Sequence, residues 1–222
     1  MSADAAKRAA GRRAAELVSD GMTVGLGTGT TVAHTIIALG ERALDITCVA
    51  TSHATEQLAT QVGLRLVAPD EVESLDIAVD GADEVDSELN LTKGGGGALM
   101  REKIVASLTE RFVVVADDSK LVGRLGDFGT PIELMPFAPR TVARAIERLG
   151  AREVLLREGP SDNGNLLADA RFGTIEDPAA LSAALDAVPG LAGHGIFLGS
   201  MVERVLVDGP GGARTITAAS RS

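Results

Sequence analysis

Short apolar runs alternate with helical patterns along the first two-thirds of the chain. The apolar runs are hydrophobic at successive positions, as in strands that are covered on both faces. Predicted strands occupy residues 22–27, 46–52, 64–68, 76–81 and 111–117. Apolar residues at helical spacing predict helices over residues 2–21, 31–43, 53–62 and 98–110. This alternation predicts an α/β domain with a parallel sheet.

The rhythm changes from Pro131 onward. The order becomes strand, helix, strand, strand, helix, strand, which is typical of a ferredoxin-like unit. Its predicted elements are residues 131–137, 139–149, 151–158, 165–172, 177–187 and 193–199. Asn163 and Gly164, in "SDNGN", predict a hairpin between the two middle strands.

The last segment predicts two more strands, 202–209 and 213–218, joined by a turn rich in glycine and proline. We expect them to return to the first sheet as its edge, which makes the smaller unit an insertion. The expected architecture is therefore a Rossmann-like catalytic domain of residues 1–129 plus 199–222, with a smaller α+β ferredoxin-like domain of residues 130–198.

Composition and charge narrow the class of protein. The chain has 222 residues, of which 45% are hydrophobic, and no stretch has the length and uniformity of a membrane span. A net charge of −10, with no Trp or Tyr, opposes binding to nucleic acid or anionic membranes. The single cysteine, Cys48, excludes an internal disulfide framework, and the N-terminus lacks a secretory signal pattern. We expect a cytoplasmic protein.

Polar clusters follow the predicted strands, at the sheet edge where ligands of parallel α/β domains bind. One cluster is "GLGTGTT", in which Thr28, Gly29, Thr30 and Thr31 offer backbone N–H groups and hydroxyls to a phosphate. An ordinary strand-to-helix turn is the alternative. A dinucleotide site would need an acidic residue about 20 positions on, whereas Glu56 lies late, inside the next helix.

A second cluster, "DGADEVD", places Asp80, Gly81, Ala82 and Asp83 after the fourth strand. Two close carboxylates raise each other's proton affinity, so one of them can donate a proton to a developing alkoxide. An Asx turn or a helix cap is the alternative. The calcium-loop spacing is missing, and no metal and no cofactor is expected.

The third cluster is "KGGGGALMREK", where Lys93 precedes Gly94, Gly95, Gly96 and a further glycine. Bare peptide N–H groups beside a helix N-terminus attract an anion, although a flexible loop has the same composition. Lys120, after the fifth strand, supplies a second positive charge at the same edge.

Glu102 lies one turn into the helix that follows the glycines. With a helix start near Ala98, the apolar arc consists of Ile104, Val105, Leu108 and Phe112, and Glu102 lies at its border. Desolvation there would raise the pKa of this carboxyl toward that of a general base, and the helix N-terminus would lower it. The alternative is that Glu102 only stabilises the dipole of its own helix.

These clusters, together with "DDSK" and "SDNGN", occur in an order and at separations that resemble the type A ribose-5-phosphate isomerase family over nearly the whole chain. The resemblance implies metal-free interconversion of ribose 5-phosphate and ribulose 5-phosphate in the pentose phosphate pathway, by homodimers or homotetramers. It also supports the Rossmann-like domain with a ferredoxin-like insertion.

When the family's functional residues are carried over position by position, the resemblance implies that Glu102 is the base that moves a proton between C1 and C2. It makes Thr28 to Thr31, Asp80 to Asp83, Lys93 to Gly96, and Lys120 substrate contacts. Asp80, Asp83 and Lys93 would assist the chemistry. Gly97, where the family commonly has alanine, and Thr30, where serine is frequent, are mild departures.

Two other classes stay open at this point. A sugar-phosphate sensor would bind ribose 5-phosphate without turnover, but it would usually need a DNA-binding segment, and we expect no spare N-terminal domain in this acidic chain. A nucleotide-dependent oxidoreductase would give a nicotinamide absorbance change, but the acidic residue after the second strand is missing.

Overall fold

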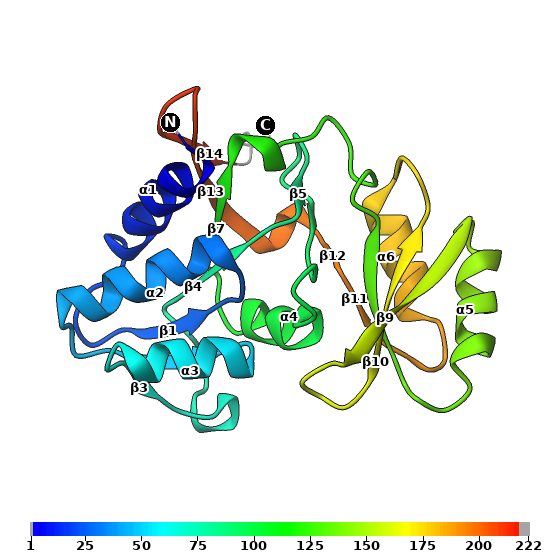
Figure 1. Ribbon diagram of the computed structural model, residues 1–222, viewed down its shortest axis with the longest axis horizontal. Helices are drawn as coiled ribbons and strands as arrows, with labels where there is room; N and C mark the ends of the chain where they lie inside the picture. Colours follow the sequence, from blue (N-terminus) through cyan, green and yellow to red (C-terminus); the bar gives the residue numbers. More distant parts are fainter. Residues whose placement is uncertain (1, 218–222) are drawn as a thin grey trace. The chain divides into compact units, whose positions relative to one another are not determined.

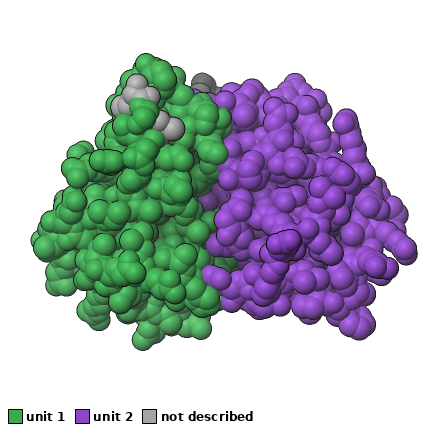
Figure 2. Space-filling view, in the orientation of Figure 1, with its two compact units in different colours: residues 1–82, 101–120, 200–222 green, residues 83–100, 121–199 purple. Residues whose placement is uncertain are grey.

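The computed structural model describes residues 2–217 (Figure 1). Residue 1 and residues 218–222 lie outside the described part, and with them Ala218 of the last predicted strand and both ends of the predicted first domain. Contacts divide the chain into two compact units, coloured in Figure 2. The first contains residues 1–82, 101–120 and 200–222, and the second contains residues 83–100 and 121–199.

The first unit is built on a seven-stranded sheet of order β14-β13-β7-β4-β1-β2-β3. All neighbouring pairs are parallel except β13 with β14. The strands are β1 (Thr23–Leu26), β2 (Thr47–Ala50), β3 (Arg65–Leu66), β4 (Ile77–Gly81), β7 (Phe112–Asp117), β13 (Val202–Asp208) and β14 (Arg214–Thr217). The predicted parallel sheet and its C-terminal edge are confirmed.

Helices cover both faces of this sheet. They are α1 (Ala3–Ala15), α2 (Thr30–Arg42), α3 (His53–Gln61) and α4 (Leu99–Ser107), the last of which belongs to the first unit from Arg101 onward. Val24 and Leu26 of β1 join a core cluster with residues of α1 and α2. Gly25, between them, faces the opposite way, and a Cβ there would lie 2.6 Å from Val105 of α4. Alternate residues of β1 therefore contact different layers.

The second unit contains the ferredoxin-like arrangement. Its sheet has the order β11-β8-β10-β9, and every pair is antiparallel. The elements are β8 (Thr130–Leu134), α5 (Pro139–Arg148), β9 (Glu153–Pro160), β10 (Leu166–Arg171), α6 (Pro178–Asp186) and β11 (Leu191–His194). A buried apolar cluster that includes Ile132, Ile146 and Leu185 packs these elements together. The predicted order of strands and helices is confirmed.

A small sheet that the sequence did not predict completes the second unit. Its strands are β5 (Glu84–Val85), β6 (Leu91–Thr92) and β12 (Ile196–Phe197), in the order β12-β6-β5. The strand predicted over 193–199 is thus split at Gly195, where β11 and β12 join different sheets. This pairing ties residues 83–100 to the second unit, which is larger than the predicted domain 130–198. The boundaries of an inserted domain stay a prediction.

Three short 3-10 helices complete the description: η1 (Pro69–Glu71), η2 (Asp118–Lys120) and η3 (Gly199–Met201). No helix within residues 2–217 combines the length and the apolar character that a membrane crossing requires.

Candidate active site

The carboxylate of Asp80 is fixed by backbone N–H groups at the end of β4. Its Oδ1 accepts from the N–H of Gly81 at 2.7 Å and from that of Thr28 at 3.1 Å. Asp80 is 3% exposed. It occupies the space in front of Gly27, where a Cβ would lie 2.1 Å from Oδ1. Gly27, the second glycine of "GLGTGTT", therefore lets the turn and the carboxylate meet.

The hydroxyl of Thr28 belongs to a local network. Its Oγ1 lies 2.8 Å from Thr51 Oγ1, 2.8 Å from Ser52 Oγ and 3.2 Å from Thr55 Oγ1. These three residues lie at the end of β2 and the start of α3. The side chain of Thr28 thus joins two adjacent loops, and its predicted contact with substrate stays a prediction.

The N-terminus of α2 is available to an anion. Its N-cap is Gly29, with φ +132°, and no side chain among the described residues caps this end. Lys7, on α1, donates from Nζ to Thr30 Oγ1 at 3.0 Å. Uncapped N–H groups, a helix dipole and an ammonium group together favour a phosphate.

Lys7 and Lys120 line one cavity of about 440 Å³ in the first unit. Asp117 and Asp118 line it as well, but both carboxylates have local partners. Asp117 accepts from the N–H of Ser119 at 2.9 Å, and Asp118 pairs with the guanidinium of Arg214. Sequence reasoning missed Lys7, because a lysine on an amphipathic helix is the usual occupant of a solvated face.

Glu102 is buried, with 3% exposure. The predicted apolar arc was misplaced on the helix: Ile104 is 48% exposed, whereas Leu99, Val105 and Ala106 are buried. Glu102 therefore lies within the buried face of α4 and not at its border. Phe112, which the predicted arc included, belongs to β7 and not to the helix.

In the second unit, the glycine run forms a defined turn. Gly94 has φ +98° and Gly97 has φ +83°, both in the region that favours glycine, and the N–H of Gly97 donates to the Gly94 carbonyl at 3.0 Å. The N–H of Gly95 donates to Asp83 Oδ2 at 2.7 Å, and a Cβ on Gly95 would lie 2.6 Å from the same carboxylate. Asp83 and the glycines are thus in direct contact.

Lys93 precedes this turn and is 2% exposed. Its N–H donates to the Gly195 carbonyl at 2.7 Å, and its Nζ lies 5.5 Å from the centroid of the Phe197 ring. Gly195 joins β11 to β12, and Phe197 is in β12. Lys93 thus contacts residues about 100 positions away in the chain, which no local feature of "KGGGG" indicated.

The predicted residues thus form two groups. Thr28 and Gly81 both donate to Asp80, Thr30 accepts from Lys7, and Lys120 lines the same cavity as Lys7. All of these residues belong to the first unit, as does Glu102. Asp83 contacts Gly95, and Lys93 and Gly96 adjoin them in the second unit. Ala82 and Asp83 are successive residues at the division between the units.

Asp86, the last residue of "DGADEVD", holds a turn. Its carboxylate accepts from the N–H groups of Glu88 and Asn90 at 2.9 and 2.8 Å. Within residues 2–217, no group of three or more His, Cys, Asp and Glu side chains is arranged to hold a metal ion.

Known proteins resemble this chain over nearly its whole length. A sequence profile of ribose 5-phosphate isomerase A (phosphoriboisomerase A) matches residues 47–212. Ribose-5-phosphate isomerase A of Bradyrhizobium diazoefficiens is 46% identical over 95% of both chains, and that of Methanosarcina acetivorans is 50% identical over 86% of both.

Solved structures agree with the sequence comparisons. Ribose 5-phosphate isomerase A from Neisseria gonorrhoeae superposes with a TM-score of 0.94 at 35% identity, covering 99% of both chains. A D-ribose-5-phosphate isomerase in complex with phospho-erythronic acid gives 0.93 at 36% identity, covering 98% of this chain and 100% of that one. The chain belongs to the ribose 5-phosphate isomerase A family, and it is a sugar-phosphate isomerase.

Proposed function

We propose that the enzyme interconverts D-ribose 5-phosphate and D-ribulose 5-phosphate by metal-free proton transfer through an enediolate, in the non-oxidative pentose phosphate pathway. Family membership supports the substrate pair. The observation that carries the mechanism is the burial of Glu102 in the first turn of α4. A carboxylate kept from bulk water retains the proton that it removes, which a stereospecific transfer between neighbouring carbons requires.

In the proposed reaction, Glu102 removes the proton from C2 of the open-chain aldose. The electron pair of that C–H bond forms a C1=C2 double bond, and negative charge develops on O1. Glu102 then returns its proton to C1 while the O2 proton moves to O1, which leaves a carbonyl at C2. Atoms and charge balance without a metal or a redox cofactor.

The oxygen that gains charge needs hydrogen-bond donors in place before the reaction. We assign this role to Lys93, to the N–H groups of the glycine turn, and to Asp80 or Asp83 in its protonated form. The same two aspartates assist opening of the sugar ring. Each is already oriented by backbone N–H groups, so little rearrangement is needed.

We assign the phosphate to the N-terminus of α2, with Thr30, Thr31, Lys7 and Lys120. Binding energy gained there, far from C1 and C2, holds the reacting carbons in position. Local cations and peptide dipoles must attract this anion against a net charge of −10. Assembly as a homodimer or homotetramer and a cytoplasmic location stay predictions.

Replacing Glu102 with glutamine tests the mechanism. Glu102→Gln keeps the shape of the side chain but cannot accept the proton, so we expect turnover of ribose 5-phosphate to fall by about 10² to 10⁴. Binding of phospho-erythronic acid, measured by calorimetry, should stay within about threefold, because the phosphate contacts lie elsewhere. Direct assay of ketose formation gives the turnover number.

Glu110→Gln is the matched control, because Glu110 is exposed and follows the same helix. It should leave turnover unchanged, and EDTA should leave the wild-type rate unchanged. Normal turnover in Glu102→Gln, or loss of the wild-type activity on chelation, contradicts the proposed mechanism.

A further inference from the structure

We propose that Arg157 is a positioning residue for the isomerase reaction, holding the glycine turn in its working conformation from β9 of the ferredoxin-like sheet. The inference rests on the function proposed above. Arg157 Nη1 donates to the carbonyls of Gly94 and Gly95, at 2.8 and 3.2 Å. All of these residues belong to the second unit.

Asp169 on β10 fixes the guanidinium from its other side. Its two oxygens accept from Arg157 Nε at 2.9 Å and Nη2 at 2.6 Å, a bidentate pair. The side chains are 19% and 23% exposed, so solvent competes little for either. Bidentate arginine–carboxylate pairs restrict the guanidinium to one plane. Nη1, the third nitrogen of the guanidinium, therefore points toward the glycine turn.

An irregularity in the β9–β10 hairpin gives Arg157 this direction. Leu156 pairs with Ala168, and Pro160 pairs with Leu166, so three residues of β9 lie opposite one residue of β10. Arg157 is the first of these three. Bulges redirect side chains that a regular ladder would keep on one face of the sheet.

The contacts of Arg157 and Asp83 meet on one peptide group. The peptide that joins Gly94 to Gly95 accepts from Arg157 at its carbonyl and donates to Asp83 Oδ2 from its N–H, at 2.7 Å. A trans peptide directs these two groups oppositely. The guanidinium, the peptide and the carboxylate therefore form one chain of hydrogen bonds, and Asp83 is oriented through Arg157.

The next peptide, which joins Gly95 to Gly96, is where the position of Arg157 affects function. The Gly95 carbonyl also turns toward Arg157, so the N–H of Gly96 in the same peptide points away from the guanidinium. Gly96 is exposed, so this donor is open to a ligand. Without the arginine, four successive glycines would sample many backbone conformations. Arg157 thus selects the conformation that offers an N–H group to the substrate oxygen.

The effect should appear in kcat more than in KM. The glycine turn is proposed to serve the oxygen that gains charge, whereas the proposed phosphate contacts lie on α1, α2 and η2. Arg157→Met keeps the length of the aliphatic stem and removes the donors. We expect kcat for ribose 5-phosphate to fall about 10- to 100-fold, since misplacement by about 1 Å costs up to roughly 10², with KM within threefold. Arg157→Lys keeps the positive charge but lacks the planar guanidinium, so its kcat should lie between that of Arg157→Met and that of wild type.

Arg171→Met is the matched control. Arg171, on β10, also donates from Nη1 to two backbone carbonyls, those of Phe128 at 3.0 Å and Asp127 at 3.4 Å, but not to the glycine turn. A purely structural role for such arginines would lower the activity of both variants alike. We expect Arg171→Met to keep kcat within about twofold of wild type.

Amide hydrogen exchange, measured by NMR without substrate, tests the positioning independently of catalysis. The Gly95 amide should exchange at least tenfold faster in Arg157→Met than in wild type and should be unchanged in Arg171→Met. If Arg157→Met does not fold, Asp169→Asn, which keeps the arginine and weakens its anchor, should show smaller changes in the same direction. Unchanged exchange at Gly95, or an unchanged kcat in a folded variant, overturns the inference. A wild-type protein without isomerase activity would instead overturn the proposed function.

Discussion

At the scale of single residues, the site requires glycine at particular positions as much as it requires particular side chains. Gly27 lies where β1 turns toward α2, and Asp80 fills the space that any Cβ would need. Gly95 has the same relation to Asp83. Two glycines thus bring backbone N–H groups up to two carboxylates. The motifs predicted glycine-rich loops. They did not predict which carboxylate lies against each glycine.

Gly27→Ala should impair the enzyme severely. The new Cβ, 2.1 Å from Asp80 Oδ1, forces the carboxylate or the turn to move. We expect kcat to fall by about 10² or more, because the donors that orient Asp80 shift with the turn. Overpacking should also lower the unfolding free energy by roughly 1 to 3 kcal/mol. Steady-state kinetics and urea unfolding measure the two effects.

Gly123→Ala is the control for this substitution. Gly123 is exposed, and a Cβ there meets nothing within 4 Å. It should behave as wild type. Equal activity of the two alanine variants would show that Asp80 tolerates displacement and plays no role that depends on its position.

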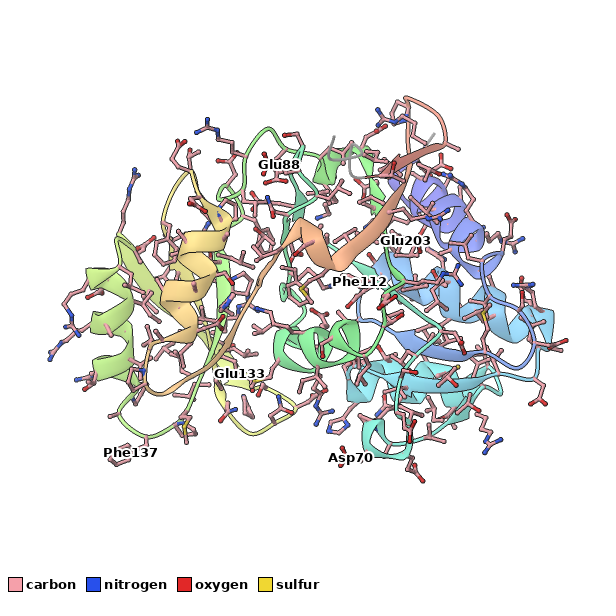
Figure 3. All side chains as sticks on the ribbon, turned by 180° about the vertical axis from the view of Figure 1, so that it is seen from behind. Asp70, Glu88, Phe112, Glu133, Phe137 and Glu203 are labelled. Carbon is pink, nitrogen blue, oxygen red and sulfur yellow. The ribbon has the colours of Figure 1, made fainter. Side chains whose placement is uncertain are left out.

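At the scale of elements, the β9–β10 hairpin connects a recognisable motif to the glycine turn. Glu133 on β8, labelled in Figure 3, has 0% exposure. Its Oε1 accepts from Ser161 Oγ at 2.8 Å, Asn163 Nδ2 at 3.0 Å and Asn165 Nδ2 at 2.8 Å. "SDNGN" is therefore a hairpin tip held by one buried carboxylate. The sequence predicted the hairpin but not the partner, because Glu133 lies about 30 residues away.

Glu133→Ala should destabilise the fold. The substitution removes the acceptor that the buried Ser161 hydroxyl shares with two amide groups. We expect the unfolding free energy to fall by about 1 to 3 kcal/mol, the range for a buried polar group that loses its hydrogen bond. Urea unfolding measures this change. Glu153→Ala, at an exposed position where β9 begins, should alter it by less than about 0.5 kcal/mol. If the two substitutions lowered the unfolding free energy by similar amounts, Glu133 would not be stabilising the hairpin tip.

At the scale of the whole molecule, stability should depend on the ionisation of one thiol. Cys48, in β2, has 0% exposure, and burial raises its pKa from 9.0 to about 12. A raised pKa favours the protonated form in the folded state. The corresponding stability is therefore fully present below pH 9 and is lost as the pH rises toward 12.

Comparison with Cys48→Ala isolates this contribution. As the pH rises from 9 toward 12, the wild-type unfolding free energy should fall faster than that of the variant by about 1.4 kcal/mol per pH unit. Urea unfolding under reducing conditions at pH 8, 9 and 10 measures both proteins. Parallel pH profiles would mean that the thiolate forms as readily in the folded chain as in the unfolded one.

The sequence by itself determined the elements of the two larger sheets, apart from the division of the last ferredoxin-like strand at Gly195, and it determined the family. These follow from patterns that are local in the chain: apolar runs, helical spacing, turn residues and motifs in order. Only the tertiary structure decided the contacts of the site: Lys7 with Thr30, Gly27 with Asp80, Arg157 with the glycine turn, and Glu102 within the buried face of α4. Each depends on which strands become neighbours and which way a helix faces, and these follow from packing among residues far apart in the chain.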